Sequence, residues 1–116
     1  MRSSPIPSCL FGLLSLTLAA SAAAAVQASV QITAPANGAK LDAMEPARLV
    51  YQVTAGPSGD HVHVYVDDKE AGILRQLAGS YTLETLGTGP HTICIKVVNK
   101  AHVPIGVEKC IKVSVE

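Results

Sequence analysis

The sequence has no excess of charge of either sign. It carries nine basic and nine acidic side chains, and the balance becomes eight against nine once Arg2 is lost with the leader considered below. A nucleic-acid partner requires a basic stripe, and attraction to anionic lipid requires a basic patch. We therefore expect neither nucleic acid nor a charged membrane surface as a partner.

Helical periodicity and catalytic motifs are also missing. No segment repeats its apolar residues with the period of an amphipathic helix. We find no serine with a nearby base, no paired carboxylates of the kind a catalytic cleft needs, and no glycine-rich phosphate loop. Asp67 and Asp68 are adjacent in a turn, where we expect a solvated hairpin tip. A mature chain of about 90 residues has little room for a substrate pocket, so we expect no enzyme activity.

The long apolar run of the chain lies at its start. Arg2 supplies a positive n-region, and an apolar h-region and a tract of small residues follow it. The run is too short to span a bilayer comfortably. Cleavage after Ala23, Ala25 or Ala28 satisfies the small-x-small rule, and we prefer the two later sites. We predict a signal peptide over residues 1–25, or as far as 28, and hence a periplasmic or secreted protein with no membrane span in its mature form.

Cysteine is scarce, with three residues in the chain. Cys9 falls in the leader before the apolar run, a position that argues against a lipoprotein anchor. Cys94 and Cys110 remain, and both alternate with apolar residues in the last two predicted strands. A hairpin around residues 99–106 puts them almost opposite each other, so we predict a disulfide worth about 3 kcal/mol on the chain-entropy argument. A pair of thiolate metal ligands is the alternative.

Short alternating segments separated by turn residues occupy the remainder of the chain. This pattern predicts an all-β protein, with residues 29–116 forming one small antiparallel β-sandwich of the immunoglobulin-like class and about seven strands. The strand count falls to six if the weakest segment, 72–77, is irregular, and residues 40–46 are expected as a polar connection. The expected strands are 29–33, 47–54, 60–67, 72–77, 81–86, 91–98 and 107–115.

The stretch D-H-V-H-V-Y-V-D at 60–67 is the centre of the functional argument. Its three valines are expected on one face, which suits a core, while His61 and His63 share the other face with Tyr65. Two imidazoles one pleat repeat apart, about 7 Å between their Cα atoms, have a spacing that can hold a metal.

A third imidazole is expected at the same end of the sandwich. The loop before the His strand and the loop between the last two strands meet at one end in this topology, and His102 lies in the second of these loops. We therefore predict a metal site of His61, His63 and His102, with Asp60 and Asn99 as candidate further oxygen ligands. Such a set suits Cu(II) or Zn(II).

The fourth histidine is expected to lie apart from this group. His91 begins its strand at the opposite end, about 20 Å away, and we interpret it as a half-buried residue hydrogen-bonded to the nearby turn. For the histidines of the 60–67 stretch, the competing interpretation is that they are polar residues on a solvated sheet face.

Several motifs resemble those of known proteins. P-A-N-G-A, G-S-Y-T-L-E-T-L-G-T-G-P-H-T-I and the alternating last hairpin resemble immunoglobulin-like or fibronectin-type-III-like modules of bacterial secreted proteins. More narrowly, G-D-H-V-H-V-Y-V-D, P-H-T-I-C-I and N-K-A-H-V-P resemble an uncharacterised bacterial periplasmic family. That family has a His-rich strand start, an H-T-L strand and an N-H-x-P loop in this order. Its strand starts with three adjacent histidines, whereas here Val62 separates His61 from His63. The resemblance implies no established activity.

We therefore expect a secreted periplasmic module that binds copper or zinc and acts as a monomeric, non-enzymatic carrier or accessory domain. The alternative is a structural or protein-interaction domain of the cell envelope, without a metal site, whose partner is another secreted or envelope protein. A metallohydrolase is a distant third interpretation.

Overall fold

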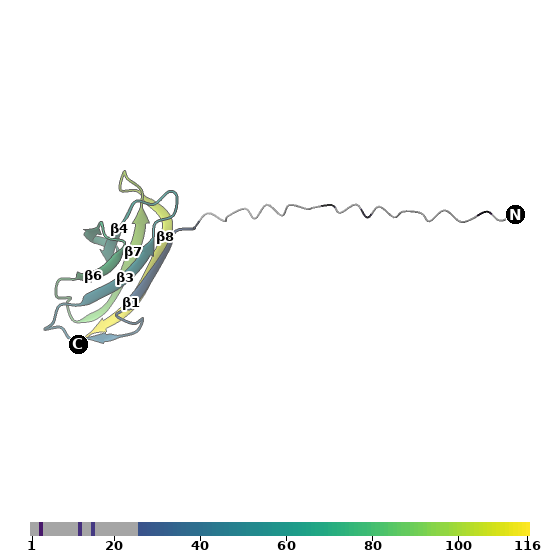
Figure 1. Ribbon diagram of the computed structural model, residues 1–116. Helices are drawn as coiled ribbons and strands as arrows, with labels where there is room; N and C mark the ends of the chain where they lie inside the picture. Colours follow the sequence, from purple (N-terminus) through teal and green to yellow (C-terminus); the bar gives the residue numbers. More distant parts are fainter. Residues whose placement is uncertain (1–2, 4–11, 13–14, 16–25) are drawn as a thin grey trace.

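The computed structural model describes residues 26–116 together with the isolated positions 3, 12 and 15. The predicted signal peptide, apart from those three positions, lies outside the described residues. Within the described residues there is no helix long and apolar enough to cross a membrane. The strands run as follows (Figure 1): β1 Ser29–Ala34, β2 Lys40–Leu41, β3 Arg48–Thr54, β4 His61–Val66, β5 Lys69–Leu74, β6 Ala78–Thr82, β7 Gly89–Val98 and β8 Pro104–Val115.

The strands form two sheets that pack into a sandwich. One sheet has the strand order β1-β3-β6, and the other has the order β2-β8-β7-β4-β5. The predicted all-β sandwich is confirmed, but it has eight strands in place of the expected seven. The additional strand is β2, which lies in the expected polar connection and pairs in parallel with the end of β8. A strand of two residues is too short to show an alternating pattern. Its pairing partner also lies far along the chain, so no local pattern predicts it.

The valines of β4 lie in the core between the sheets. Val62 and Val64 are fully buried and pack in one cluster with Leu49 and Tyr51 of the opposite sheet. Full burial of a valine side chain contributes about 1.5–3 kcal/mol. A slip of β4 by one residue would exchange these valines for His61 and its neighbours, so core packing fixes which face the histidines occupy.

The β7–β8 hairpin has the predicted register. Cys94 pairs directly with Cys110, and their sulfur atoms form a disulfide across a sequence separation of 16 residues. The predicted disulfide is therefore confirmed, and the alternative of two thiolate ligands is wrong in this oxidised form. Ile93 and Ile95 of β7 are fully buried on the core side, as their alternation with Cys94 predicts.

Four strands begin earlier than expected: β7 begins at Gly89 in place of 91, β8 begins at Pro104 in place of 107, and two more are shifted toward the N-terminus. The strand predicted at 72–77 is found at 69–74, and the one predicted at 81–86 is found at 78–82. Asp67 and Asp68 both have positive φ, at 51° and 66°, which aspartate tolerates better than most residues. They reverse the chain within two residues, so pairing with β4 resumes at once at Lys69.

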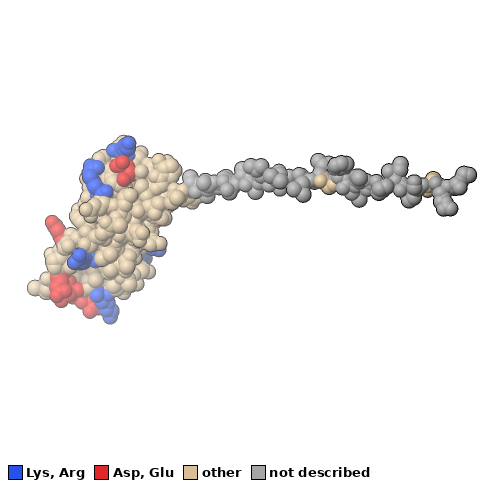
Figure 2. Space-filling model, viewed as in Figure 1, with Lys and Arg blue, Asp and Glu red and all other residues tan. Residues whose placement is uncertain are grey.

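Charged side chains are distributed without a broad field of one sign on the face of the domain that Figure 2 shows. Blue and red groups lie close together near the two ends of the described domain, and a wide area between them carries few charges.

Candidate metal centre

Two histidines of β4 lie on the outer face of the five-stranded sheet, yet they are buried. His61 and His63 have exposed fractions of 2% and 3%. In the sheet, His61 pairs with the buried Val98 and His63 pairs with Lys96, both on β7. The histidines are therefore not solvated polar residues, which is what the competing interpretation required.

The β7–β8 loop brings the third histidine over this face. Asn99 Oδ1 accepts hydrogen bonds from the backbone N–H groups of Ala101 and Val103, at 2.9 and 3.1 Å. The N–H of His102 donates to the Asn99 carbonyl at 3.0 Å, and the N–H of Asn99 donates to the Val103 carbonyl at 2.9 Å. These bonds close a turn that leaves His102 at a φ of 64°, a conformation in which histidine is enriched among non-glycine residues.

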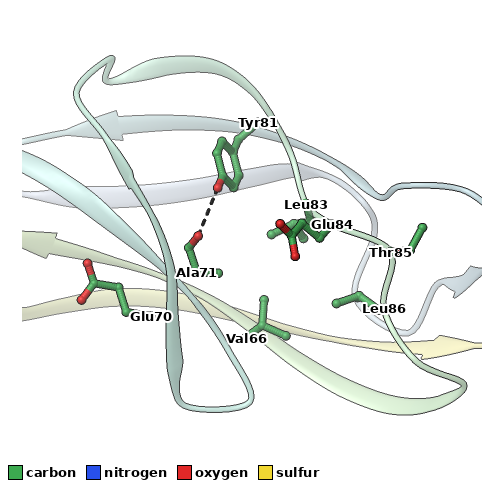
Figure 3. Close-up of a pocket in the computed structure, with 8 residues that line it drawn as sticks. All are labelled: Val66, Glu70, Ala71, Tyr81, Leu83, Glu84, Thr85 and Leu86. Atoms are coloured by element: carbon green, nitrogen blue, oxygen red, sulfur yellow. Dashed lines mark hydrogen bonds between the residues drawn. The ribbon is translucent and has the colours of Figure 1, made fainter.

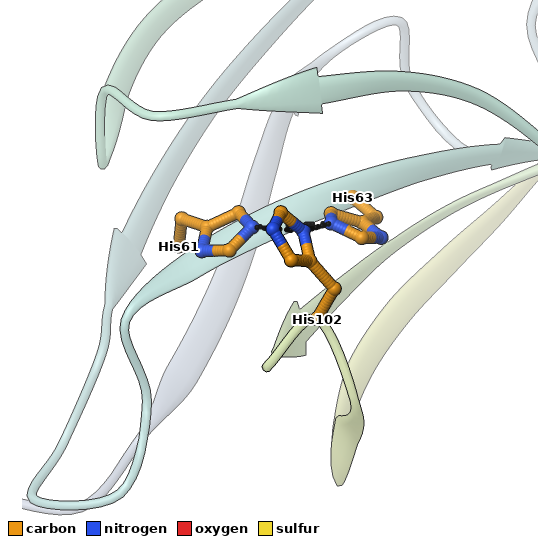
Figure 4. A group of neighbouring side chains, drawn as sticks. All are labelled: His61, His63 and His102. Carbon is orange, nitrogen blue, oxygen red and sulfur yellow. Dashed lines mark hydrogen bonds between the residues drawn. The ribbon is translucent and has the colours of Figure 1, made fainter. Parts of the chain in front are cut away.

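The three imidazoles point toward one another, as Figure 4 shows. Nε2 of His61 lies 3.1 Å from Nε2 of His63, and Nδ1 of His102 lies 3.1 Å from each of these two nitrogens. The structure thus brings the three predicted ligands together in an equilateral triangle of ring nitrogens.

Hydrogen bonds alone account poorly for this triangle. A neutral imidazole has one N–H, directed along the ring plane, and it serves one acceptor well. Nδ1 of His61 lies 2.9 Å from Oδ2 of Asp60, and because a carboxylate only accepts, this nitrogen carries the proton. In the neutral ring with its proton on this nitrogen, Nε2 of His61 presents a lone pair to the triangle. A cation placed between the three nitrogens satisfies all three lone pairs together, as no set of N–H donors does.

Carboxylates lie behind two of the three rings. Asp60 contacts His61 on the nitrogen that faces away from the triangle. Oε1 of Glu70 lies 3.5 Å from Nδ1 of His63, a buried atom that has no hydrogen-bond partner. A carboxylate on the distal nitrogen of a metal-bound histidine is a common arrangement, because it fixes the tautomer and raises the basicity of the ligand.

The two candidate oxygen ligands occupy other positions than those proposed for them. Asp60 lies on the distal nitrogen of His61, and Oδ1 of Asn99 accepts backbone hydrogen bonds of its own loop. Sequence spacing places both residues near the site but carries no information about which atom they face. Glu70 was not singled out from the sequence, although its register opposite Tyr65 places it beside the His strand.

The surroundings of His63 favour its neutral form. Burial is the main cause that lowers the pKa of His63; the neighbouring His61, His102 and Arg75 also lower it, while Glu70 raises it. A neutral imidazole is the form that binds a metal.

His91 lies in a separate hydrogen-bonded group. Its Nδ1 is 2.6 Å from Oδ2 of Asp67, and its Nε2 is 2.6 Å from the carbonyl oxygen of Gly87. Asp67 Oδ1 also accepts a hydrogen bond from the backbone N–H of Thr92. Asp67 thus connects the β4–β5 turn to β7, which goes beyond the solvated hairpin tip expected from the sequence. The Thr92 N–H and then His91 lower the pKa of Asp67, while Asp67 and then the Gly87 carbonyl raise the pKa of His91.

A hollow of about 370 Å³ lies elsewhere, beside β5 and β6 (Figure 3). Val66 and Leu83 supply apolar surface, Glu70 and Glu84 supply carboxylates, and the Tyr81 hydroxyl donates to the Ala71 carbonyl at 3.2 Å. This volume lies within the range of small-molecule pockets, so the expectation of little room for a pocket is wrong in size. Its lining includes none of the four histidines.

Comparisons with known proteins support the fold class. No protein family matches the chain, and no curated protein matches it. A structure of fibronectin(III)-like modules of Clostridium thermocellum CbhA is similar, with a TM-score of 0.64 and 19% identity over 78% of this chain and 47% of that one. An engineered protein has a TM-score of 0.55 and 19% identity over 80% of this chain and 21% of its own.

A third solved structure is more distant. The lytic polysaccharide monooxygenase of Jonesia denitrificans has a TM-score of 0.47 and 21% identity over 71% of this chain and 60% of that one, too loose a match to support an inference. The CbhA comparison supports a fibronectin-III-like fold for this chain. This chain spans about half of the CbhA structure. At identities near 19%, the similarity supports a shared fold but no shared function.

Proposed function

We propose that this protein is a metal-binding module whose site consists of His61, His63 and His102. The observation that carries the proposal is the triangle of ring nitrogens, each 3.1 Å from the other two. Side chains with no common ligand would not bring three lone-pair-bearing atoms so close in a largely buried position, because each would lose hydrogen bonds to water.

The shape of the triangle favours Zn(II) over Cu(II). With metal–nitrogen bonds of about 2.05 Å, a triangle of this size gives nitrogen–metal–nitrogen angles of about 100°. These angles are close to tetrahedral, the geometry that zinc adopts. In square-planar coordination, which suits Cu(II), two of three ligands are trans and lie about 4 Å apart. Copper is therefore the second choice and zinc the first.

The module acts as a carrier or accessory domain and not as an enzyme. Among the described residues, no cysteine or carboxylate joins the three imidazoles, and Asp60 is hydrogen-bonded to the distal nitrogen of His61. The predicted signal peptide supports a location in the periplasm or outside the cell, where a monomeric module of this kind would buffer or deliver metal.

A second function is supported by the fold comparison. Fibronectin-III-like modules are similar to this chain in fold, and a module of this class can serve as a structural or interaction domain next to another secreted protein. In that case the imidazole cluster is incidental and binds metal weakly or not at all.

Isothermal titration of the chain from Val26 onward with Zn(II) and Cu(II) separates the two. The metal proposal expects one-to-one zinc binding that is lost in a His63→Ala, His102→Ala double variant and kept in His91→Gln. The last variant is a matched control, because it removes an imidazole outside the triangle. The absence of zinc binding, or binding that survives in the double variant, would leave the structural module as the better account.

A further inference from the structure

We propose that the metal in this site keeps one coordination position for an imidazole from outside the chain. This inference rests on the proposed function and specifies how the site meets a second molecule. Within the described residues, the group formed by His61, His63 and His102, whose ligand atoms lie within 4.8 Å of one another, includes no cysteine, carboxylate or further histidine. Zinc is usually four-coordinate, and sites with three protein ligands keep the fourth position open.

The two oxygen donors that the sequence suggested make other contacts. Asp60 is hydrogen-bonded to His61 on its distal nitrogen. The amide oxygen of Asn99 holds two backbone N–H groups of the loop. If either residue moved to the metal, the hydrogen bonds that orient His61 or His102 would be lost. A fourth ligand from these two residues would therefore cost free energy.

The three imidazoles lie on the face of the sheet that is opposite to the core. The valines of β4 point toward the opposite sheet, and the histidines point the other way. An ion bound at about 2.05 Å from each nitrogen lies about 1 Å outside the plane of the triangle. His102 itself is exposed, so a donor from solvent can approach past its ring.

Apolar side chains stand beside the site. Ile73 of β5 pairs with His63 across the sheet and has an exposed fraction of 47%. Val103 follows His102 in the loop and has an exposed fraction of 52%. A ring donor can lay its face against such side chains and gain apolar contact, whereas a small anion cannot.

The charges around the site also favour a neutral donor. A divalent ion bound to three neutral imidazoles has a charge of plus two, and the carboxylates of Asp60 and Glu70 stand behind two of the rings. These two negative charges balance the ion, which weakens the attraction of the centre for an anion. An imidazole completes the coordination without adding charge.

Cobalt(II) provides the test, because its visible spectrum reports coordination geometry and ligand exchange. The Co(II)-loaded chain from Val26 onward is titrated with imidazole, with azide, and with a blocked Gly-His-Gly peptide. We expect imidazole to change the spectrum with saturation, at a concentration about tenfold lower than azide needs. A similar response to the peptide would assign the donor to a protein side chain. A response to imidazole alone would assign it to small molecules.

The outcomes separate this inference from the proposed function. If the chain binds no Co(II) or Zn(II), both fail. If it binds metal but neither imidazole nor azide changes the spectrum, the site is closed and this inference alone is overturned. Tighter binding of azide than of imidazole would overturn the choice of donor. An Ile73→Ser variant provides a further check: it should weaken imidazole about threefold to fivefold, leaving azide and Co(II) affinities unchanged.

Discussion

Replacing His102 by glycine isolates the contribution of the third ligand with little effect on the fold. His102 has a φ of 64°, a left-handed conformation that costs a residue with a side chain about 1–2 kcal/mol. Glycine adopts it freely but loses more chain entropy on folding, by about 0.5–1 kcal/mol. The two effects nearly cancel, so the metal-free variant should unfold within about 1 kcal/mol of the parent.

The effect on metal binding should be large. A ligand present at a hundred times its Kd stabilises the native state by about 2.7 kcal/mol, which raises Tm by about 10–20 °C in a domain of this size. The parent chain should show this rise in scanning calorimetry with zinc, and His102→Gly should show none at the same zinc concentration. His91→Gln should behave as the parent does. An equal rise in parent and His102→Gly would show that zinc acts elsewhere and would refute the reasoning.

Three further predictions concern the residues around the site and the hairpin. Asn99→Ala should weaken zinc binding about tenfold in titration, since the loop loses the acceptor for two backbone N–H groups, and Asn99→Asp should restore it. The Asp67–His91 pair stabilises the fold between the ordinary pKa values of 3.8 and 6.5, and its contribution is lost below the lowered pKa of Asp67 and above the raised pKa of His91. Asp67→Asn should therefore cost up to about 1 kcal/mol in urea unfolding near about pH 5 and less near about pH 9; an equal cost at both would contradict the pairing. Replacing Cys94 and Cys110 by serine should cost about 3 kcal/mol in urea unfolding while zinc affinity stays unchanged, and a loss of zinc binding would show that the hairpin positions the triangle.

Alternation in the sequence was enough to predict the fold class and the end of the sandwich where the histidines meet. In β4 every second residue is a valine, and core burial makes that register the stable one. The positions of His61 and His102 at one end then follow from antiparallel connectivity, because loops before and after neighbouring strands share an end.

Other features depend on contacts that leave no local pattern. β2 exists through backbone pairing with β8, far away in the sequence. The roles of Asp60 and Asn99 depend on which atom each side chain faces, and spacing does not encode that. Burial of His61 and His63 on an outer sheet face depends on the loop that carries His102, whose turn is set by side-chain to backbone hydrogen bonds. Sequence alone therefore predicted the three histidines of the candidate site but not the contacts of Asp60 and Asn99 around them.

The central claim is that the three imidazoles hold one metal ion. Its most direct test is anomalous diffraction at the zinc absorption edge, on crystals of the chain from Val26 onward grown with one equivalent of Zn(II). The account predicts a single strong peak about 2.0–2.1 Å from Nε2 of His61, Nε2 of His63 and Nδ1 of His102. No peak, or a peak at His91 or at the surface carboxylates with the triangle unoccupied, would contradict it.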